Sequence, residues 1–292
     1  MPYAKAKDGT RLYYKDWGTG DAVVLLHGWP LTGDTFDDAA LALADAGKRC
    51  IIPDRRGFGR SDQPWNGYDY DTFADDIVAI LDDAGIADPV ALVGFSMGGG
   101  EVARFLTRQG AQRVSSAVLI SSVVPYMLQT DDNPHGVPQS VFDQMTAGMK
   151  QDREHFFKGF LKDFFGVGAL TSPVSDEVLM NNWRQTMMAG LRPTLAAAQA
   201  FATTDFRPDL ASFTVPTLII HGTADATVPI DTSARPAAKA IPGAKLIEYD
   251  GSPHGLFATD KQRLIDDLVD FLGNSSSGRD NRSAIPLERQ AT

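Results

Sequence analysis

One five-residue segment, Gly94-Phe95-Ser96-Met97-Gly98, constrains the fold more than any other part of the sequence. It follows the apolar run at residues 89–93 and opens a helix-like stretch over residues 97–109. A serine between two glycines, at a sharp turn from a buried strand into a helix, is typical of a nucleophile elbow. Both flanks must be glycine because larger side chains would collide across the turn. The pattern therefore predicts a serine Oγ at the carboxyl edge of a sheet, beside the Met97 N–H and the positive end of a helix dipole.

Length and composition indicate an ordinary globular protein and exclude several classes of function. The 292 residues, 43% of them hydrophobic and 22% charged, suffice for one large α/β domain or a core with an insertion. The formal net charge of −10 argues against nucleic acid and against an anionic membrane surface as partners. No apolar run approaches the roughly 20 residues that span a bilayer, and the first residues lack the apolar core of a signal peptide. The oligomeric state stays open, a homo-oligomer included.

Cys50 is the single cysteine, which excludes an internal disulfide. It lies in a buried-strand pattern at residues 50–53, where a packing thiol is expected. A lone reduced thiol suits a reducing compartment, so we expect a cytoplasmic protein.

Strands alternate with helices over most of the chain. Strands are predicted at residues 10–17, 22–26, 50–53, 89–93, 114–121, 217–220 and 245–249, and helices at residues 35–46, 72–83, 97–109, 231–240 and 261–272. This alternation predicts βαβ units and a mainly parallel sheet covered on both faces.

Residues 124–209 break the alternation. This stretch is rich in Phe, Met, Asn and Pro, with short helical runs such as 153–164 and 178–188 and no buried strand. We interpret it as a helical cap inserted into one discontinuous core domain of residues 1–123 and 210–272. The polar residues 273–292 cannot bury enough surface to offset their ordering entropy, and are expected to form a disordered tail.

A serine becomes a nucleophile only when a base removes its proton and a carboxylate orients that base. Asp225 follows the strand at 217–220 and His254 follows the strand at 245–249, so both are expected at the edge that carries Ser96. Asp231 is the weaker alternative as the acid, because it falls where a helix begins.

The remaining histidines have other predicted roles. His27 and His221 each end a strand before a glycine, a position typical of loop bracing, whereas His135 and His155 are expected to be solvated in the cap.

The oxyanion of an acyl-transfer intermediate needs N–H donors, each contributing about 3 to 4 kcal/mol. Met97 N–H is one candidate, and Trp29 N–H, after the strand at 22–26, is the other. Pro30 restricts the backbone of Trp29 and so fixes where its N–H and C=O point. Alternatively, Trp29 is only a pocket wall and Pro30 only a turn residue.

The substrate is expected to contact Trp29, Pro30, Phe160 and Val228. The cap phenylalanines Phe142, Phe156, Phe157, Phe160, Phe164 and Phe165 suit an apolar site, although most of them are expected to anchor the cap. The charged run at residues 54–61 is expected to be a structural loop with paired charges.

Five blocks of the sequence resemble those of the cofactor-free haloperoxidases, also described as perhydrolases, and their arylesterase relatives, within the α/β-hydrolase superfamily. The blocks are His27-Gly28-Trp29-Pro30-Leu31, Asp54-Arg55-Arg56-Gly57-Phe58-Gly59-Arg60-Ser61, Gly94 to Glu101, Ala200-Phe201 through Thr204-Asp205-Phe206, and Pro253-His254-Gly255-Leu256. The resemblance covers residues 3–272.

The resemblance implies an α/β-hydrolase fold, Ser96 as nucleophile, His254 as base, Asp225 as its orienter, and Trp29 and Met97 as oxyanion donors. It also implies no metal, no haem and no other cofactor. Its substrates would be a small ester or carboxylic acid together with water or hydrogen peroxide. The proline that follows the tryptophan is similar to the residue at this position in the peroxide-using members of the family.

Three other functions remain open from the sequence. The chain could be an amidase or γ-lactamase, a carbon–carbon bond hydrolase, or a non-catalytic ligand-binding protein with the same fold. Halogen or epoxide displacement is disfavoured, because those hydrolases carry aspartate where this chain has Ser96.

Overall fold

The computed structural model describes residues 2–168 and 170–277. In this part of the chain, eight strands form one sheet in the order β1-β2-β4-β3-β5-β6-β7-β8. Strand β2 is antiparallel to β1 and β4, and the pairs from β4 through β8 are parallel. The strand bounds are β1 Tyr3–Lys5, β2 Arg11–Gly18, β3 Ala22–Leu26, β4 Arg49–Pro53, β5 Val90–Phe95, β6 Val114–Ile120, β7 Thr217–Gly222 and β8 Lys245–Tyr249.

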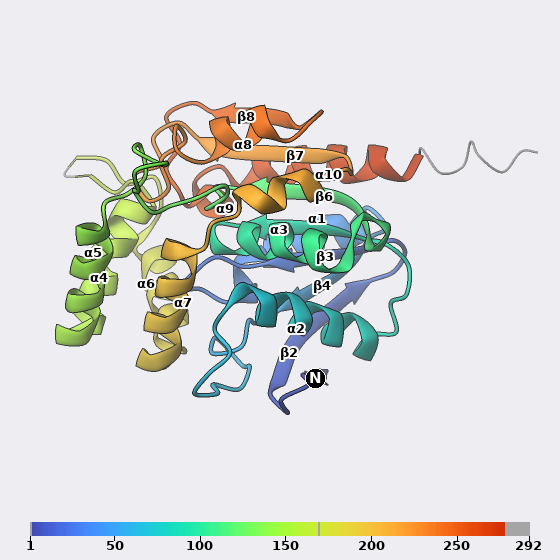
Figure 1. Cartoon of the computed structure of the whole chain (residues 1–292), viewed down its shortest axis with the longest axis horizontal. Helices are drawn as coiled ribbons and strands as arrows, with labels where there is room; N and C mark the ends of the chain where they lie inside the picture. The colour runs from blue at the N-terminus through green and yellow to red at the C-terminus, as the bar shows by residue number, and fades with distance from the viewer. Residues whose placement is uncertain (1, 169, 278–292) are drawn as a thin grey trace, which may run out of the picture.

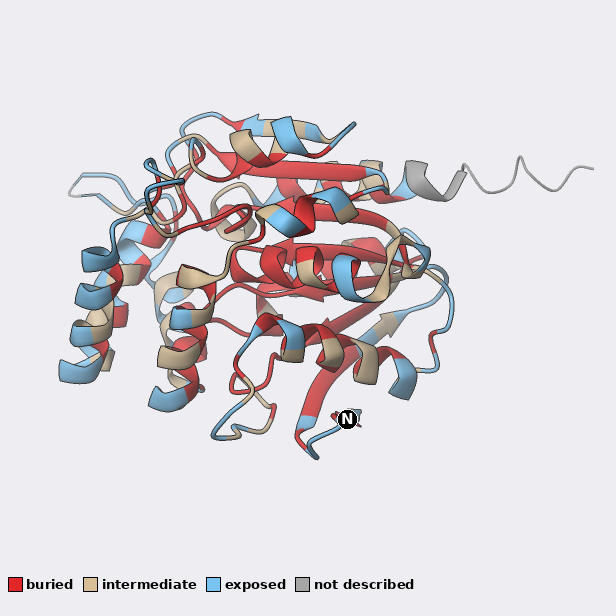
Figure 2. Ribbon diagram, in the orientation of Figure 1, coloured by how far each residue is buried: buried red, intermediate tan, exposed pale blue. Residues whose placement is uncertain are grey.

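Each face of the sheet has its own hydrophobic core, because alternate residues of a strand point to opposite faces. In β3, Val24 and Leu26 pack with α2 (Tyr70–Asp83), α3 (Met97–Gln109) and α8 (Ala234–Ala240). Val23 and Leu25 pack with α1 (Asp37–Asp45) and α10 (Lys261–Ser277) on the other face. Figures 1 and 2 show the helices flanking a largely buried sheet, with their exposed surfaces turned outward.

The elements agree closely with the sequence patterns, with differences at their ends. Strand β1 lies at one edge of the sheet, so the strand predicted at residues 10–17 is β2, one position inside that edge. Helix α1 begins later than predicted because residues Gly33–Phe36 form a 3-10 turn, η1, with Thr32 as its cap. Helix α8 begins after the predicted residue 231, because Thr232 and Ser233 still close turns onto Pro229 and Ile230.

In the described residues between β6 and β7, the chain forms four α-helices: α4 (Gln139–Gln151), α5 (Arg153–Phe164), α6 (Asp176–Met187) and α7 (Leu191–Thr203). They lie together at one end of the sheet (Figure 1). Short elements complete the described chain: η2 (Ala111–Arg113), η3 (Arg207–Ser212) and α9 (Leu256–Thr259). The division into a core and a cap of residues 124–209 stays a prediction.

Helix α10 continues to Ser277, past the predicted end at Leu272, and residues 278–292 of the predicted tail lie outside the described residues. Among the helices described, none has the length and apolar character needed to cross a membrane.

Candidate active site

Ser96 lies at the turn between β5 and α3 with φ 54° and ψ −116°, a conformation that non-glycine residues rarely adopt. The two flanking glycines permit this turn. A Cβ at Gly94 would collide with the Gly98 carbonyl, and a Cβ at Gly98 would collide with the carbonyl of Leu26. The Ser96 amide is fixed by its hydrogen bond of 2.8 Å to the Ile120 carbonyl on β6. The local geometry is therefore that of the predicted elbow.

Asp225 and His254, which follow the neighbouring strands β7 and β8, meet in a hydrogen bond. His254 Nδ1 donates to Asp225 Oδ2 at 2.6 Å. The other carboxylate oxygen accepts the N–H groups of Thr227 and Val228 at 2.9 and 2.8 Å. Burial acts to raise the pKa of Asp225, but His254 and His221 outweigh it and hold that pKa well below its usual range. Asp225 is thus a buried, ionised acceptor that fixes the orientation of the His254 ring.

The second ring nitrogen of His254, Nε2, is buried and has no hydrogen-bond partner among the described residues. The ring packs against Phe95 at 5.1 Å and against Phe164, the last residue of α5, at 4.7 Å between centroids. Phe95 is the neighbour of Ser96, so this packing brings the histidine beside the elbow. Nε2 is therefore available to accept a proton from a neighbouring group.

Two backbone N–H groups are free next to the serine. Neither the Met97 N–H nor the Trp29 N–H donates a hydrogen bond to another described residue. Met97 opens α3, and Trp29 follows β3, which pairs with β5. Both groups therefore fit the predicted role of oxyanion donors. The Trp29–Pro30 peptide bond is cis.

The side chain of Trp29 also forms a wall of the site. Its indole Nε1 donates to the carbonyl of Thr194 on α7 at 3.0 Å. The ring contacts Phe157, Phe160 and Phe201 at centroid distances of 5.5, 5.5 and 5.4 Å. Trp29 thus joins the loop after β3 to the helices of the predicted cap.

Ser96 opens into a cavity of about 230 Å³ with largely apolar walls. Three of the four residues predicted to contact substrate, Trp29, Phe160 and Val228, line it, whereas Pro30 is not among the described residues that do so. The rest of the lining includes residues that were not predicted from the sequence to lie at the site: Val123, Met127, Val137, Val141, Met145, Asp163, Phe201, Ala226 and Thr227. Of the cap phenylalanines predicted to suit an apolar site, Phe142 lines the cavity together with Phe160. Of the other cap phenylalanines, Phe157, Phe164 and Phe165 are fully buried in the cores, consistent with anchoring.

Comparisons with known proteins agree with this geometry. Residues 21–261 match the family model described as alpha/beta hydrolase fold. The chain is 43% identical over 274 residues to "Non-heme chloroperoxidase CPO-A1" of Kitasatospora aureofaciens, covering 93% of this chain and 99% of the relative. It is 40% identical over 275 residues to "Bifunctional esterase/perhydrolase DCH" of Acinetobacter calcoaceticus, with the same coverage. The chain is an α/β-hydrolase of the non-heme haloperoxidase branch.

Two solved structures support the assignment of this chain to the α/β-hydrolases. The bromoperoxidase from Bacillus anthracis superimposes with a TM-score of 0.89 at 43% identity, covering 93% of this chain and 99% of that chain. An esterase from Exiguobacterium antarcticum superimposes with a TM-score of 0.88 at 33% identity, covering 93% and 98%.

Asp231 and the remaining histidines make other contacts. Asp231 is exposed and paired with Arg235 at 2.7 Å. His221 Nε2 lies 2.8 Å from the Val228 carbonyl and 3.2 Å from Asp225 Oδ2, so it braces the loop after β7, as predicted. His135 and His155 are exposed. Within the described residues, no three His, Cys, Asp or Glu side chains gather as a group that could hold a metal ion.

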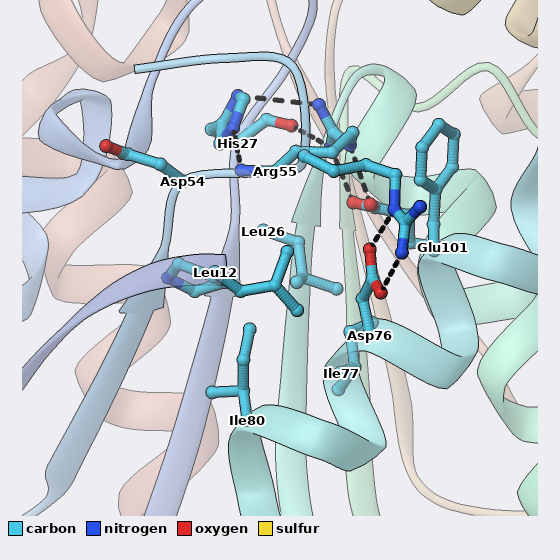
Figure 3. A pocket seen from close by; sticks show the side chains of 12 residues that line it. Leu12, Leu26, His27, Asp54, Arg55, Asp76, Ile77, Ile80 and Glu101 are labelled. Atoms are coloured by element: carbon cyan, nitrogen blue, oxygen red, sulfur yellow. Dashed lines mark hydrogen bonds and ion pairs between the residues drawn. The ribbon is translucent and has the colours of Figure 1, made fainter. Parts of the chain in front are cut away.

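Residues of the charged run at 54–61 form a buried network with His27, Asp76 and Glu101 (Figure 3). Arg55 binds both oxygens of Glu101, on α3, at 2.6 and 2.5 Å. It also donates from Nη2 to the His27 carbonyl at 2.6 Å, and its N–H donates to His27 Nε2 at 3.0 Å. Burial, together with the Arg55 charge, holds the pKa of His27 well below its usual range. Arg55 therefore ties the loop after β3 to the elbow helix of the hydrolase.

The space beside this network is too small for a substrate. Its cavity of about 20 Å³ accommodates on the order of one water molecule. The neighbouring Arg56 binds Asp76 through two hydrogen bonds of 2.5 and 2.6 Å. The loop is thus a structural one with paired charges, as predicted.

Proposed function

We propose that this hydrolase cleaves small esters, with aryl or short-acyl groups, through an acyl-enzyme on Ser96, and that hydrogen peroxide can replace water in the second half of the reaction. The observation that carries the proposal is the buried His254 ring, held through Nδ1 by Asp225 at 2.6 Å while its Nε2 has no partner among the described residues. The names of the relatives, a chloroperoxidase and an esterase/perhydrolase, support the same chemistry.

In the first half-reaction, His254 Nε2 takes the proton of Ser96 as Oγ attacks the ester carbonyl carbon. The negative charge that develops on the carbonyl oxygen is stabilised by the N–H groups of Trp29 and Met97. His254 then returns the proton to the departing alcohol or phenol, and the acyl group remains on Ser96. The ionised Asp225 stabilises the imidazolium that forms in between.

In the second half-reaction, His254 removes a proton from water or from hydrogen peroxide, which attacks the acyl carbon. Water gives the carboxylic acid, and peroxide gives the peracid; in each case Ser96 regains its proton. Run from acetic acid and peroxide, the same steps give peracetic acid and water. The peracid then oxidises halide in solution.

The apolar cavity supports the choice of substrate class. Val123, Phe142, Phe201 and Val228 offer contact area to an aryl or alkyl group but few hydrogen bonds. A volume of about 230 Å³ suits a small acyl or aryl ester rather than a long chain.

We assign Pro30 a role in the choice between water and peroxide. A proline fixes the backbone of the residue before it, so the Trp29 carbonyl can be aimed to accept a hydrogen bond from the incoming peroxide. The ratio of perhydrolysis to hydrolysis measures this directly. It should fall in Pro30→Leu, and an unchanged ratio would remove the role.

Two assays test the proposed function. Wild type and Ser96→Ala are compared with 4-nitrophenyl acetate, and with acetic acid plus hydrogen peroxide. We expect Ser96→Ala to lose at least about 10³-fold in kcat in both assays. Retained turnover by Ser96→Ala would refute the assignment of the nucleophile. A panel that adds lactams and other amides separates an esterase from an amidase.

A further inference from the structure

Two methionine side chains, Met127 and Met145, line the cavity that contains Ser96. Met127 lies in the loop after β6 and is 3% exposed, and Met145 lies on α4 and is half-buried. The proposed ester chemistry does not use either sulfur. A thioether is, however, a nucleophile toward peroxy oxygen, and this cavity is where the proposed peracid forms.

We propose that Met127 and Met145 are modification sites, oxidised to sulfoxides by the peracid that the enzyme itself makes; this rests on the proposed function. The thioether sulfur attacks the terminal peroxy oxygen, an S–O bond forms and the O–O bond breaks. The peroxy proton passes to the departing carboxylate. Sulfur loses two electrons, and the peracid is reduced to the carboxylic acid, so no further oxidant is needed.

Confinement favours these two sulfurs over all others in the described chain. A peracid molecule that forms in this cavity shares a confined space with both sulfurs, at a local concentration on the order of molar. Released peracid in bulk solution is far more dilute and meets the exposed methionines first. Met180 and Met188, which are 51% and 40% exposed, are therefore internal reporters of bulk oxidation.

Oxidation would change the site in a defined direction. A sulfoxide replaces a flexible apolar group with a polar, chiral one. At Met127 and Met145 this places a polar oxygen on the wall that contacts the acyl or aryl group. KM for an apolar ester should rise as turnover proceeds, and a methionine sulfoxide reductase should reverse the change.

The experiment compares wild type with Ser96→Ala in acetic acid and hydrogen peroxide, with peptide mapping by mass spectrometry over time. Excess free methionine in solution consumes released peracid. We expect sulfoxide at Met127 and Met145 to form at least tenfold faster in wild type than in Ser96→Ala, and to persist with the scavenger. Sulfoxide at Met180 and Met188 should form at similar rates in both proteins once the scavenger is present.

The amount of peracid in the same samples distinguishes a failure of the methionine-oxidation proposal from a failure of the proposed perhydrolase function. If wild type makes peracid but Met127 and Met145 oxidise no faster than in Ser96→Ala, or only without the scavenger, the modification proposal is wrong and the proposed function stands. If wild type makes no peracid, the perhydrolase part of the proposed function fails and this inference fails with it. A Met127→Leu/Met145→Leu variant gives a further test, in which the activity of each protein is expressed relative to its own initial rate. The variant should complete more turnovers than wild type before this relative activity falls.

Discussion

The buried ion pair between Arg55 and Glu101 gives a quantitative test of how the site is supported. Their side chains are 3% and 4% exposed, and the pair links the loop after β4 to the elbow helix α3. Glu101→Gln keeps the size and shape of the side chain but removes its charge. Arg55 is then left as a buried cation without a counter-ion, and it still has to hold the His27 carbonyl.

Removing one partner of a buried pair costs about 3–5 kcal/mol. The amide oxygen of glutamine can still accept one Arg55 hydrogen bond, so we take the lower end, about 3 kcal/mol. That loss corresponds to a fall in Tm of about 5 °C, because the entropy of unfolding is about 2.1 cal/mol/K per residue. Because Arg55 also ties down the loop that carries Trp29, kcat for 4-nitrophenyl acetate should fall as well.

Asp62→Asn is the matched control, since it removes the charge of an exposed pair. Arg11 and Asp62 lie 2.9 Å apart with side chains that are 65% and 38% exposed. Its loss should cost at most about 1 kcal/mol. Urea unfolding followed by circular dichroism measures both variants. If Glu101→Gln is no more destabilised than Asp62→Asn, the reasoning about the buried network is wrong.

Three further predictions follow from the described geometry. Asp225→Asn should lower kcat for 4-nitrophenyl acetate by about 10⁴-fold, whereas Asp231→Asn, which changes only an exposed ion pair, should keep kcat within about twofold of the wild-type value. Similar losses of kcat in both variants would overturn the choice of Asp225 as the acid. Gly94→Ala should abolish activity or soluble expression because its Cβ meets the carbonyl of the elbow's second glycine, whereas Gly159→Ala, in open space on a helix, should be neutral or stabilising by up to about 1 kcal/mol. Burial raises the pKa of Cys50 to about 12, so little of the thiol is ionised in the folded state. At pH 9, iodoacetamide should therefore label the native protein negligibly and the unfolded protein readily. Fast labelling of the native protein would contradict the buried position of Cys50.

The sequence allowed the elbow and its partners to be placed because each follows a strand. Ser96 comes after β5, Asp225 after β7 and His254 after β8, and parallel strands bring their carboxyl ends to one edge. The predicted positions depended only on local pattern and chain order. The hydrogen bond between Asp225 and His254 is then a consequence of two neighbouring strands.

The walls of the cavity could not be predicted in the same way. Met127, Met145 and Phe201 reach the cavity from the loop after β6, from α4 and from α7. Their positions depend on how the helices pack over the sheet, which hydrophobic periodicity does not specify. The ion pair between Arg55 and Glu101 could not be predicted either. The two residues are distant in sequence, and they come into contact only because α3 packs beside the loop after β4.

Direct capture of the acyl-enzyme tests the central claim, that Ser96 carries the acyl group between the two half-reactions. Wild type and Ser96→Ala are mixed with 4-nitrophenyl acetate, quenched in acid during the first turnovers, digested and mapped by mass spectrometry. We expect an acetyl ester on Ser96 in wild type and none in the peptide that spans residue 96 of Ser96→Ala. An acetyl group on any other residue that forms and decays at the rate of turnover would contradict the account.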